Sequence, residues 1–298
     1  MALIKCPECG HDVSDKAKAC PNCGFPMSIE EKKVSNNIEE MDSVYLGRYP
    51  QSVVKDTSLI DLLDDKSKKI ESGYFMCNGK KYFKLKKKYY EYEPIRWRVL
   101  EKKGNSALLI TDKFLAKRMF SSTIFVDEGG YIFDVDDCSN WDTSDLRKWL
   151  NKDFFDNAFN AVEQDVIETR ELDNSLKSTG LEEINNKYIR FESTKDKLFI
   201  LSFLEAKTLF KNDSDRKAEP TDFSDPFHIN PTSTSQWLRS PANWFYNVPP
   251  VNHKIHKRIV QLIRYDGKLF HAFAEVENNE FIRIACYVNI NMFKKINM

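Results

Sequence analysis

Two pairs of cysteines near the start of the chain carry the clearest chemical signal in the sequence. Cys6 and Cys9 form one Cys-x-x-Cys pair, and Cys20 and Cys23 form a second. Each pair can present two thiolates to one face of a metal ion, and a glycine follows each pair, which lets the backbone curl around the sulfurs. We therefore expect one structural zinc ion bound by all four cysteines. A redox dithiol is the alternative, but the βαβ pattern around such motifs is missing from the sequence.

Residues 1–26 are too few to fold by hydrophobic burial alone, so the metal should supply their folding energy. This segment resembles the short zinc ribbons at the N-termini of many bacterial proteins, and that resemblance implies a docking or stiffening module. Residues 27–42 are charged, and Ser28 and Glu31 have the spacing of a capping box. We expect them to form a linker with a short helix, followed by a larger domain over residues 43–298.

A second candidate site centres on Trp237 and Arg239. In an extended strand these two side chains point to the same face, and Pro241 should end the pairing because it has no N–H to donate. Arg239 is expected either to stack on Trp237 and hydrogen-bond loop carbonyls, or to contact a ligand directly. We expect Arg283, on the last strand, to lie near this surface.

The segment from Ala242 to His256 is dense in aromatic residues and interrupted by prolines. Aromatic side chains dominate binding hot spots, so this segment either folds down as a lid on the core or faces a partner. In the second interpretation the binding residues are Trp237, Arg239, Asn243, Trp244, Phe245, Tyr246 and Arg283. His253, His256 and the distant His228 lack an accompanying carboxylate spacing that would indicate a metal site.

Alternating hydrophobic residues predict a domain of antiparallel hairpins with a few short helices. The strongest turn signals are Asn78-Gly79, Lys103-Gly104-Asn105 and Asp266-Gly267. The third signal predicts a two-residue turn that pairs Val260 with Phe273.

Short helices are expected in the middle of the chain, and Lys197–Leu201 is predicted to be a strand between them. Cys286 lies on an apolar face of the last strand, which predicts a small buried hydrophobic residue and not a nucleophile. Cys77 and Cys138 are interpreted in the same way. The expected helix caps are Asp142 or Thr143, Asn160 with Glu163, and Ser202 with Glu205.

The run Lys84–Tyr90 combines four lysines with two tyrosines. Such a run can contact nucleic acid. We favour the alternative, in which it is a solvated edge strand protected from pairing by its lysines.

The balance of charged residues limits the classes of partner that the protein as a whole can attract. Lys plus Arg and Asp plus Glu number 45 each, so no global field draws the protein to nucleic acid or anionic lipid, and any such binding must be local. No stretch approaches the roughly 18 apolar residues of a membrane helix, and the N-terminus lacks the apolar core of a secretory signal. Seven cysteines, four of them in two pairs, fit metal binding in a reducing compartment. We expect a cytoplasmic protein with no membrane partner, which binds a protein or small molecule in preference to nucleic acid.

Several motifs together carry a family resemblance. They are Tyr45 to Gln51, Pro94 to Leu100, Trp141 to Phe159, Trp237 to Pro241, Tyr265-Asp266-Gly267 and Ile282-Arg283. In this order they resemble the bacterial domain family DUF6273, over most of residues 43–290. The resemblance implies an α+β, C-type-lectin-like fold, which also houses formylglycine-generating enzymes and the variable binding proteins of retroelements. Because the family has no established activity, the resemblance implies no catalytic residues.

Three functions are open at this point. The first, which we favour, is a non-enzymatic binding or protein-interaction protein, with the zinc ribbon as docking module and the lectin-like domain as scaffold. The second is an enzyme on a scaffold similar to the formylglycine-generating enzymes; the sequence has no HExxH, GxSxG, P-loop or GxGxxG motif and no close cysteine pair in the main domain. The third is a nucleic-acid-binding protein that uses the ribbon and Lys84–Lys88.

Overall fold

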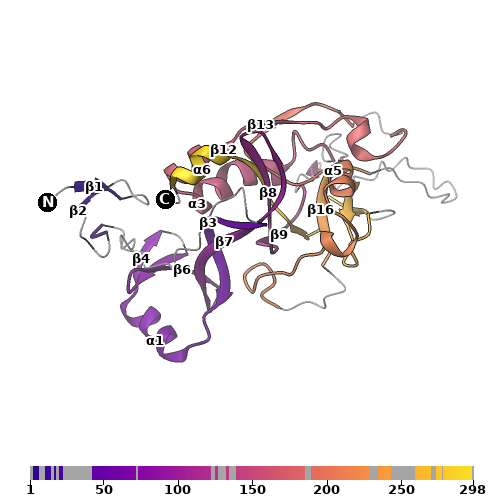
Figure 1. Cartoon of the computed structure of the whole chain (residues 1–298). Coiled ribbons are helices and arrows are strands. Elements are labelled where there is room, and N and C mark those ends of the chain that lie inside the picture. Colours follow the sequence, from indigo (N-terminus) through magenta and orange to yellow (C-terminus); the bar gives the residue numbers. More distant parts are fainter. Residues whose placement is uncertain are drawn as a thin grey trace.

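A computed structural model describes residues 3–6, 11–14, 17, 20–22, 42–71, 73–121, 125–126, 132–133, 139–184, 189–227, 234–242, 259–269, 273–276 and 278–296. Over these residues the chain mixes short helices with mostly antiparallel sheets, as the sequence predicts. Two sheets form the body of the main domain (Figure 1). The expected helix within residues 27–42 lies outside the described residues, except for Asp42.

The larger sheet has nine strands. They are β3 (Ser43–Val53), β4 (Lys68–Glu71), β5 (Tyr74–Cys77), β6 (Lys80–Leu85), β7 (Lys88–Lys103), β8 (Ser106–Thr111), β12 (Ile167–Glu168), β15 (Leu198–Phe199) and β20 (Ala285–Asn289). The order is β12-β20-β8-β7-β6-β5-β4, with β15 paired to β20 and β3 paired to β7. All of these pairings are antiparallel. The strand expected over residues 197–201 is therefore shorter than predicted.

Two predicted hairpins are confirmed in this sheet. Asn78 and Gly79 join β5 to β6 with φ angles of 50° and 76°, the left-handed geometry that Asn-Gly turns adopt readily. Gly104, with φ 58°, and Asn105 join β7 to β8.

The run Lys84–Tyr90 is not an edge strand. It ends β6, turns at Lys86 and Lys87, and begins β7, and both strands have neighbours on each side. The lysines therefore do not protect a sheet edge, and their exposure needs another explanation.

The second sheet has five strands. They are β9 (Ala116–Arg118), β16 (Gln236–Pro241), β17 (Ile259–Ile263), β18 (Phe273–Glu275) and β19 (Glu280–Ile282). The order is β18-β17-β16-β19-β9, and β16 runs parallel to β19. As predicted, β16 ends at Pro241.

The hairpin between β17 and β18 is present, but its predicted register is wrong by one residue. Val260 pairs with Ala274 and Gln261 with Phe273. The turn is longer than the expected two residues, since the Arg264 N–H donates to the Lys268 carbonyl at 2.9 Å and encloses three residues, the last of which is Gly267 with φ 85°.

Two short connections among those that pass from one sheet to the other meet each other. One joins β8 to β9, and the other joins β19 to β20. They are linked where they cross, because the Thr111 N–H donates to the Ile284 carbonyl at 2.8 Å and the Ile284 N–H donates to Thr111 Oγ1 at 3.1 Å. This link fixes the two sheets relative to each other.

Short strand pairs and helices complete the fold. The pairs are β1 (Leu3–Lys5) with β2 (Asp12–Ser14), β10 (Phe125–Val126) with β11 (Ile132–Phe133), and β13 (Arg170–Leu172) with β14 (Thr194–Asp196). The helices are α1 (Thr57–Lys66), α2 (Asp145–Trp149), α3 (Phe155–Ala158), α4 (Ala161–Val166), α5 (Phe203–Thr208) and α6 (Ile290–Ile296), with short turns η1 (Leu150–Phe154), η2 (Leu176–Thr179) and η3 (Ser214–Arg216). None of the helices in the described residues has the length and apolar character needed to cross a membrane.

The cap of α2 differs from the two expected residues. Ser144 is the cap, since its Oγ accepts from the Arg147 N–H at 3.2 Å. Asp142 is engaged elsewhere, with its carboxylate 3.0 Å from Arg190. The two predicted capping boxes are confirmed: Asn160 with Glu163 begins α4, and Ser202 with Glu205 begins α5.

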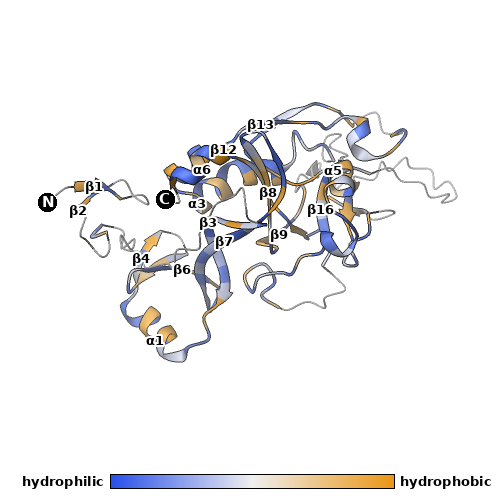
Figure 2. Ribbon diagram, in the orientation of Figure 1, coloured by the Kyte–Doolittle hydropathy of each residue, from blue (hydrophilic) through white to orange (hydrophobic). Residues whose placement is uncertain are grey.

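The hydrophobic core spans both sheets and the central helices. Its largest fully buried side chains include Trp97, Phe154, Phe199 and Trp237. A separate cluster lies in the part of the chain that we call the arm, residues 55–90, where α1 covers one face of β5, β6 and β7 through Leu63. In Figure 2 the apolar residues of α1 appear in orange within the arm.

Candidate functional site

The N-terminal segment brings the first cysteine of each pair into one small interior. Cys6 and Cys20 are both 2% exposed and cluster with Val13, while the Cys6 N–H donates to the His11 carbonyl at 2.8 Å. Cys9 and Cys23 lie outside the described residues. Two buried thiols from separate Cys-x-x-Cys pairs fit the donor set of a zinc ribbon. Within the described residues no group of three or more metal-ligating side chains is found.

Trp237 is buried near the start of β16 and holds a neighbouring strand in place. Its side chain is 1% exposed and its indole N–H donates to the Arg118 carbonyl of β9 at 2.8 Å. The ring meets Phe120 edge-on, with centroids 5.7 Å apart. In this position Trp237 links β16 to β9 and packs in the core.

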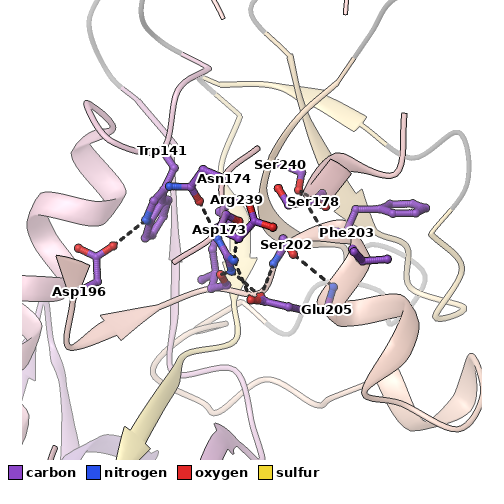
Figure 3. Close-up of polar contacts among 12 residues, drawn as sticks. Trp141, Asp173, Asn174, Ser178, Asp196, Ser202, Phe203, Glu205, Arg239 and Ser240 are labelled. Carbon is purple, nitrogen blue, oxygen red and sulfur yellow. Dashed lines mark hydrogen bonds and ion pairs between the residues drawn. The ribbon is translucent and has the colours of Figure 1, made fainter. Parts of the chain in front are cut away.

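Arg239 projects from the middle of β16 into the protein and is 2% exposed. All five of its guanidinium N–H groups have acceptors (Figure 3). Two of these N–H groups donate to the Glu205 carboxylate, with nitrogen–oxygen distances of 2.5 and 2.7 Å. The other three donate to the Ile200 carbonyl at 2.9 Å, the Asp173 carbonyl at 3.2 Å and Asn174 Oδ1 at 2.9 Å. The expected hydrogen bonds to loop carbonyls are confirmed, but the guanidinium lies over Phe199, at 5.7 Å, where stacking on Trp237 was expected.

Glu205 serves two roles at once. Its carboxylate accepts from the Ser202 N–H at 2.9 Å, which completes the capping box of α5, and it also forms the ion pair with Arg239. Burial raises the pKa of Glu205, but the charge and hydrogen bonds of Arg239 and the bond from Ser202 outweigh this effect, and the pKa lies below its ordinary value. The carboxylate is therefore ionised, and α5 is fixed to β16.

The chain before η2 is fixed by the same arginine. Arg239 contacts Asp173 and Asn174, which precede η2, and the Asp173 carboxylate accepts from the Ser175 N–H at 2.8 Å. Hydrogen bonding with the Ser175 side chain lowers the pKa of Asp173, and the bond from the Ser175 N–H and the nearby positive charge of Arg239 lower it further. One buried guanidinium thus joins β16, α5 and the segment leading into η2.

The end of β16 is held by two further polar side chains. Ser240 Oγ accepts from the Phe203 N–H at 2.9 Å. Gln261 of β17 donates to the Thr179 carbonyl and the Pro241 carbonyl, both at 2.9 Å. The Ala242 N–H then donates to the Ile259 carbonyl at 3.1 Å. The two ends of segment 243–258 are therefore held together on a rigid base.

Arg283 is also buried, at 2% exposure, but its contacts are separate from those of Arg239. It lies where the chain crosses between the sheets, and it donates to the Thr111 carbonyl at 2.9 Å and the Arg216 carbonyl at 3.0 Å. Burial lowers the pKa of Arg283 to about 9, and the positive charge of Arg98 lowers it as well. One terminal nitrogen, Nη2, has no hydrogen-bond partner among the described residues.

Comparison with known protein families finds a match for most of the main domain. A model described as "Domain of unknown function (DUF6273)" matches residues 104–290, more than half of the chain. The chain belongs to the DUF6273 family. The matched part of the DUF6273 protein contains Arg239, Glu205 and Arg283, while β3 and the arm precede it, so the match starts later than the expected residue 43.

A zinc-ribbon domain model matches residues 5–27, in agreement with the predicted ribbon. An uncharacterized protein of Haemophilus influenzae is 56% identical over 25 residues, which cover 8% of this chain and 33% of that protein. The chain thus spans about a third of the length of the curated relative it matches. No solved structure matches the chain.

The expected binding residues are thus found in two different settings. Trp237, Arg239 and Arg283 are inside the DUF6273 domain, where the bonds of Arg239 leave it no N–H for a ligand in this conformation. Asn243, Trp244, Phe245 and Tyr246 lie outside the described residues, and their contact with a partner remains a prediction.

The structure also shows an aromatic cluster that the sequence analysis missed. Phe223 contacts Tyr49, Phe83 and Tyr90, with ring centroids 5.2 to 5.7 Å apart. The cluster joins the arm to β3 and to the segment after η3. Its members are far apart in the sequence, and no local spacing pattern connects Phe223 to them.

Proposed function

We propose that this protein is a non-enzymatic binding protein, in which the zinc ribbon is a docking module and the DUF6273 domain is a scaffold for a partner-binding segment. The partner is a protein or a small molecule. The surface comprises segment 243–258, with Asn243, Trp244, Phe245 and Tyr246 in contact with the partner. Trp237, Arg239 and Arg283 act from inside the domain.

The rigid base of segment 243–258 carries this proposal. Arg239 commits its whole hydrogen-bonding capacity to β16, α5 and the segment before η2, and Gln261 and Ala242 tie the strand ends together. A preorganised base lowers the entropy lost on binding, and aromatic side chains supply most of the contact energy in protein interfaces. The sequence therefore concentrates hot-spot residues where the scaffold is firmly held.

The ribbon supports a docking role. Two buried cysteines from separate pairs fit one structural zinc ion with four thiolate ligands, and a site with all positions filled by protein is structural and not catalytic. We infer a cytoplasmic protein, since the odd number of cysteines and the paired spacing suit a reducing compartment. We also infer a C-type-lectin-like fold for the main domain, on the motifs that resemble that group.

The test combines partner capture with stability. Trp244→Ala and Tyr246→Ala should each weaken binding of a captured partner by about 2 kcal/mol or more while the melting temperature stays nearly unchanged. Phe191→Ala, at a partly exposed aromatic side chain outside the segment, is the matched control and should affect neither. A Trp244 variant that is much less stable but keeps full affinity would show that the segment is a lid on the core. Turnover on a broad substrate panel would favour the enzyme alternative.

A further inference from the structure

The turn between β6 and β7 presents three consecutive lysines to solvent. Leu85 pairs with Lys88, so Lys86 and Lys87 form a two-residue turn, and Lys86, Lys87 and Lys88 are all exposed. The preceding Lys84 differs, since its ammonium lies 2.7 Å from the Asp64 carboxylate. The three turn lysines therefore supply positive charge that no carboxylate neutralises among the ion pairs of the described residues.

A distant part of the chain places an aromatic ring beside these lysines. Phe227 is 74% exposed, the largest exposed fraction of any large hydrophobic side chain in the described residues. Lys86 Nζ lies 5.2 Å from its ring centroid, and Lys88 Nζ donates to the Pro226 carbonyl at 3.2 Å. Leu85 adds a second apolar side chain, 37% exposed. We call Leu85–Lys88 together with Phe227 the lysine tip.

The charge of the arm differs from that of the whole protein. Residues 55–90 contain ten lysines, five carboxylates and no arginine, a net charge of +5, while the entire chain is neutral. A local excess of this size attracts anionic surfaces even though the protein as a whole does not.

The backbone of the tip indicates that the lysines are present at a cost. Lys86 has a φ angle of 56°, a left-handed conformation in which Cβ is crowded by the following carbonyl oxygen and which residues other than glycine, asparagine and aspartate rarely adopt. The neighbouring turn in the same sheet also begins with a left-handed residue, but there it is Asn78, a residue type that adopts this conformation at lower cost. Strained residues persist where another requirement outweighs turn stability, and they concentrate at functional sites.

We propose that the lysine tip binds the surface of an anionic phospholipid membrane, with Phe227 and Leu85 entering the interface and Lys86, Lys87 and Lys88 contacting the headgroups. Peripheral binding of this kind combines apolar side chains with a cluster of basic residues, and lysine side chains can keep their charge in water while apolar neighbours are inserted. This contact does not depend on the partner of segment 243–258.

Three features favour a membrane over nucleic acid. Leu85 is aliphatic and cannot stack on a base, and a cation already lies over the ring of Phe227. The arm also has no arginine, the residue that most often reads base edges and stacks on bases. The expectation of no membrane partner relied on the balanced charge of the whole chain and on the missing membrane helix, and a surface contact at one turn requires neither.

The test measures flotation of the full-length protein with vesicles of phosphatidylglycerol and phosphatidylcholine, and with vesicles of phosphatidylcholine alone. Wild-type protein should bind the anionic vesicles, and salt should weaken the binding. Lys86→Asn with Lys87→Gly places at this exposed turn two residues that tolerate its backbone, since asparagine adopts the left-handed conformation and glycine adopts any, so it should keep the fold while it reduces affinity about twenty-five-fold, at roughly fivefold per lysine. Phe227→Ser should reduce affinity several-fold at both low and high salt.

A charge-matched control is Lys294→Gln with Lys295→Gln, in α6, which should leave binding within about twofold of wild type. The proposal is overturned if wild-type protein does not bind anionic vesicles at low salt, or if the double turn variant binds as well as wild type. Tighter binding to a single-stranded oligonucleotide than to the vesicles, unaffected by Phe227→Ser, would assign the tip to nucleic acid instead and would also overturn it.

Discussion

Arg239 and Glu205 form a two-point ion pair inside the main domain, with guanidinium nitrogens 2.5 and 2.7 Å from the two carboxylate oxygens. The arginine comes from β16 and the glutamate from the first turn of α5, so the pair joins a sheet to a helix. Charge-assisted bonds with this fork geometry are shorter and stronger than bonds between neutral groups.

Arg239→Ala should reduce the free energy of unfolding by about 3 kcal/mol, the lower end for buried pairs, because the Glu205 side chain retains 31% exposure. Denaturant titration measures this change. Arg239→Lys should also destabilise, since an ammonium cannot replace the two-point contact. If Arg239→Ala and Glu205→Gln added without coupling in the double variant, the ion pair would not be the cause.

Glu205 should make stability depend on pH. Its pKa is lower in the folded protein than the ordinary 4.5, so its contribution is fully present above that value and is lost as the pH falls through the lower folded pKa. The free energy of unfolding of the wild type should therefore fall more steeply than that of Glu205→Gln as acid is added below about pH 4.5. Parallel curves for the two proteins would contradict the assignment.

Purified protein should contain one zinc ion per chain, bound by Cys6, Cys9, Cys20 and Cys23. Elemental analysis measures it, and Cys6→Ser should remove the metal. Chelation should unfold the ribbon and leave the main domain folded, since that domain has its own core. A single melting transition that moved by many degrees on chelation would show that the two parts are coupled.

Cys286→Ser should reduce stability by about 1–3 kcal/mol without affecting binding, because a hydroxyl would be poorly satisfied on this apolar strand. Cys286 is 0% exposed, and burial raises the pKa of its thiol. The native thiol should react with a thiol reagent only as fast as the protein unfolds. Rapid labelling of Cys286 under native conditions would mean that the strand is exposed.

In the double variant of Lys86→Asn with Lys87→Gly, the first substitution should raise the free energy of unfolding by up to about 1 kcal/mol, because asparagine adopts the left-handed conformation at lower cost than lysine, while Lys87 is not left-handed and its replacement adds no such gain. Thermal melting measures the gain. The same substitutions should lower membrane binding, so stability and binding should change in opposite directions. A destabilised variant would show that the lysine side chains support the fold.

Local patterns predicted local structure well. The capping boxes at Asn160 and Ser202 and the turn at Asn78 involve residues two to four positions apart, so the sequence contains all of the interacting groups. The predicted register of β17 and β18 was wrong because Gly267 closes a three-residue turn, and sequence alone could not choose between that turn and a two-residue one.

Contacts between distant segments could not be predicted. Glu205 was recognised as a cap residue, but nothing near it in the sequence indicates Arg239 as its partner. The lysine run is visible in the sequence, whereas Phe227 joins it only through folding. Burial of Arg283 likewise depends on the crossing of two stretches of chain at Thr111.

The place of β20 in the larger sheet has a consequence for synthesis. β20 pairs with β8 on one side and with β12 and β15 on the other, so it lies inside a sheet whose other strands all precede it in the chain. While the nascent chain is still being extended toward residue 285, β8 has an unpaired edge on the side away from β7. The core residues that pack over this edge then lack the β20 side chains that they contact in the finished protein. A chain that ended in this interval would keep this sheet edge exposed, and exposed edges and apolar surface are what make unfinished chains prone to aggregation.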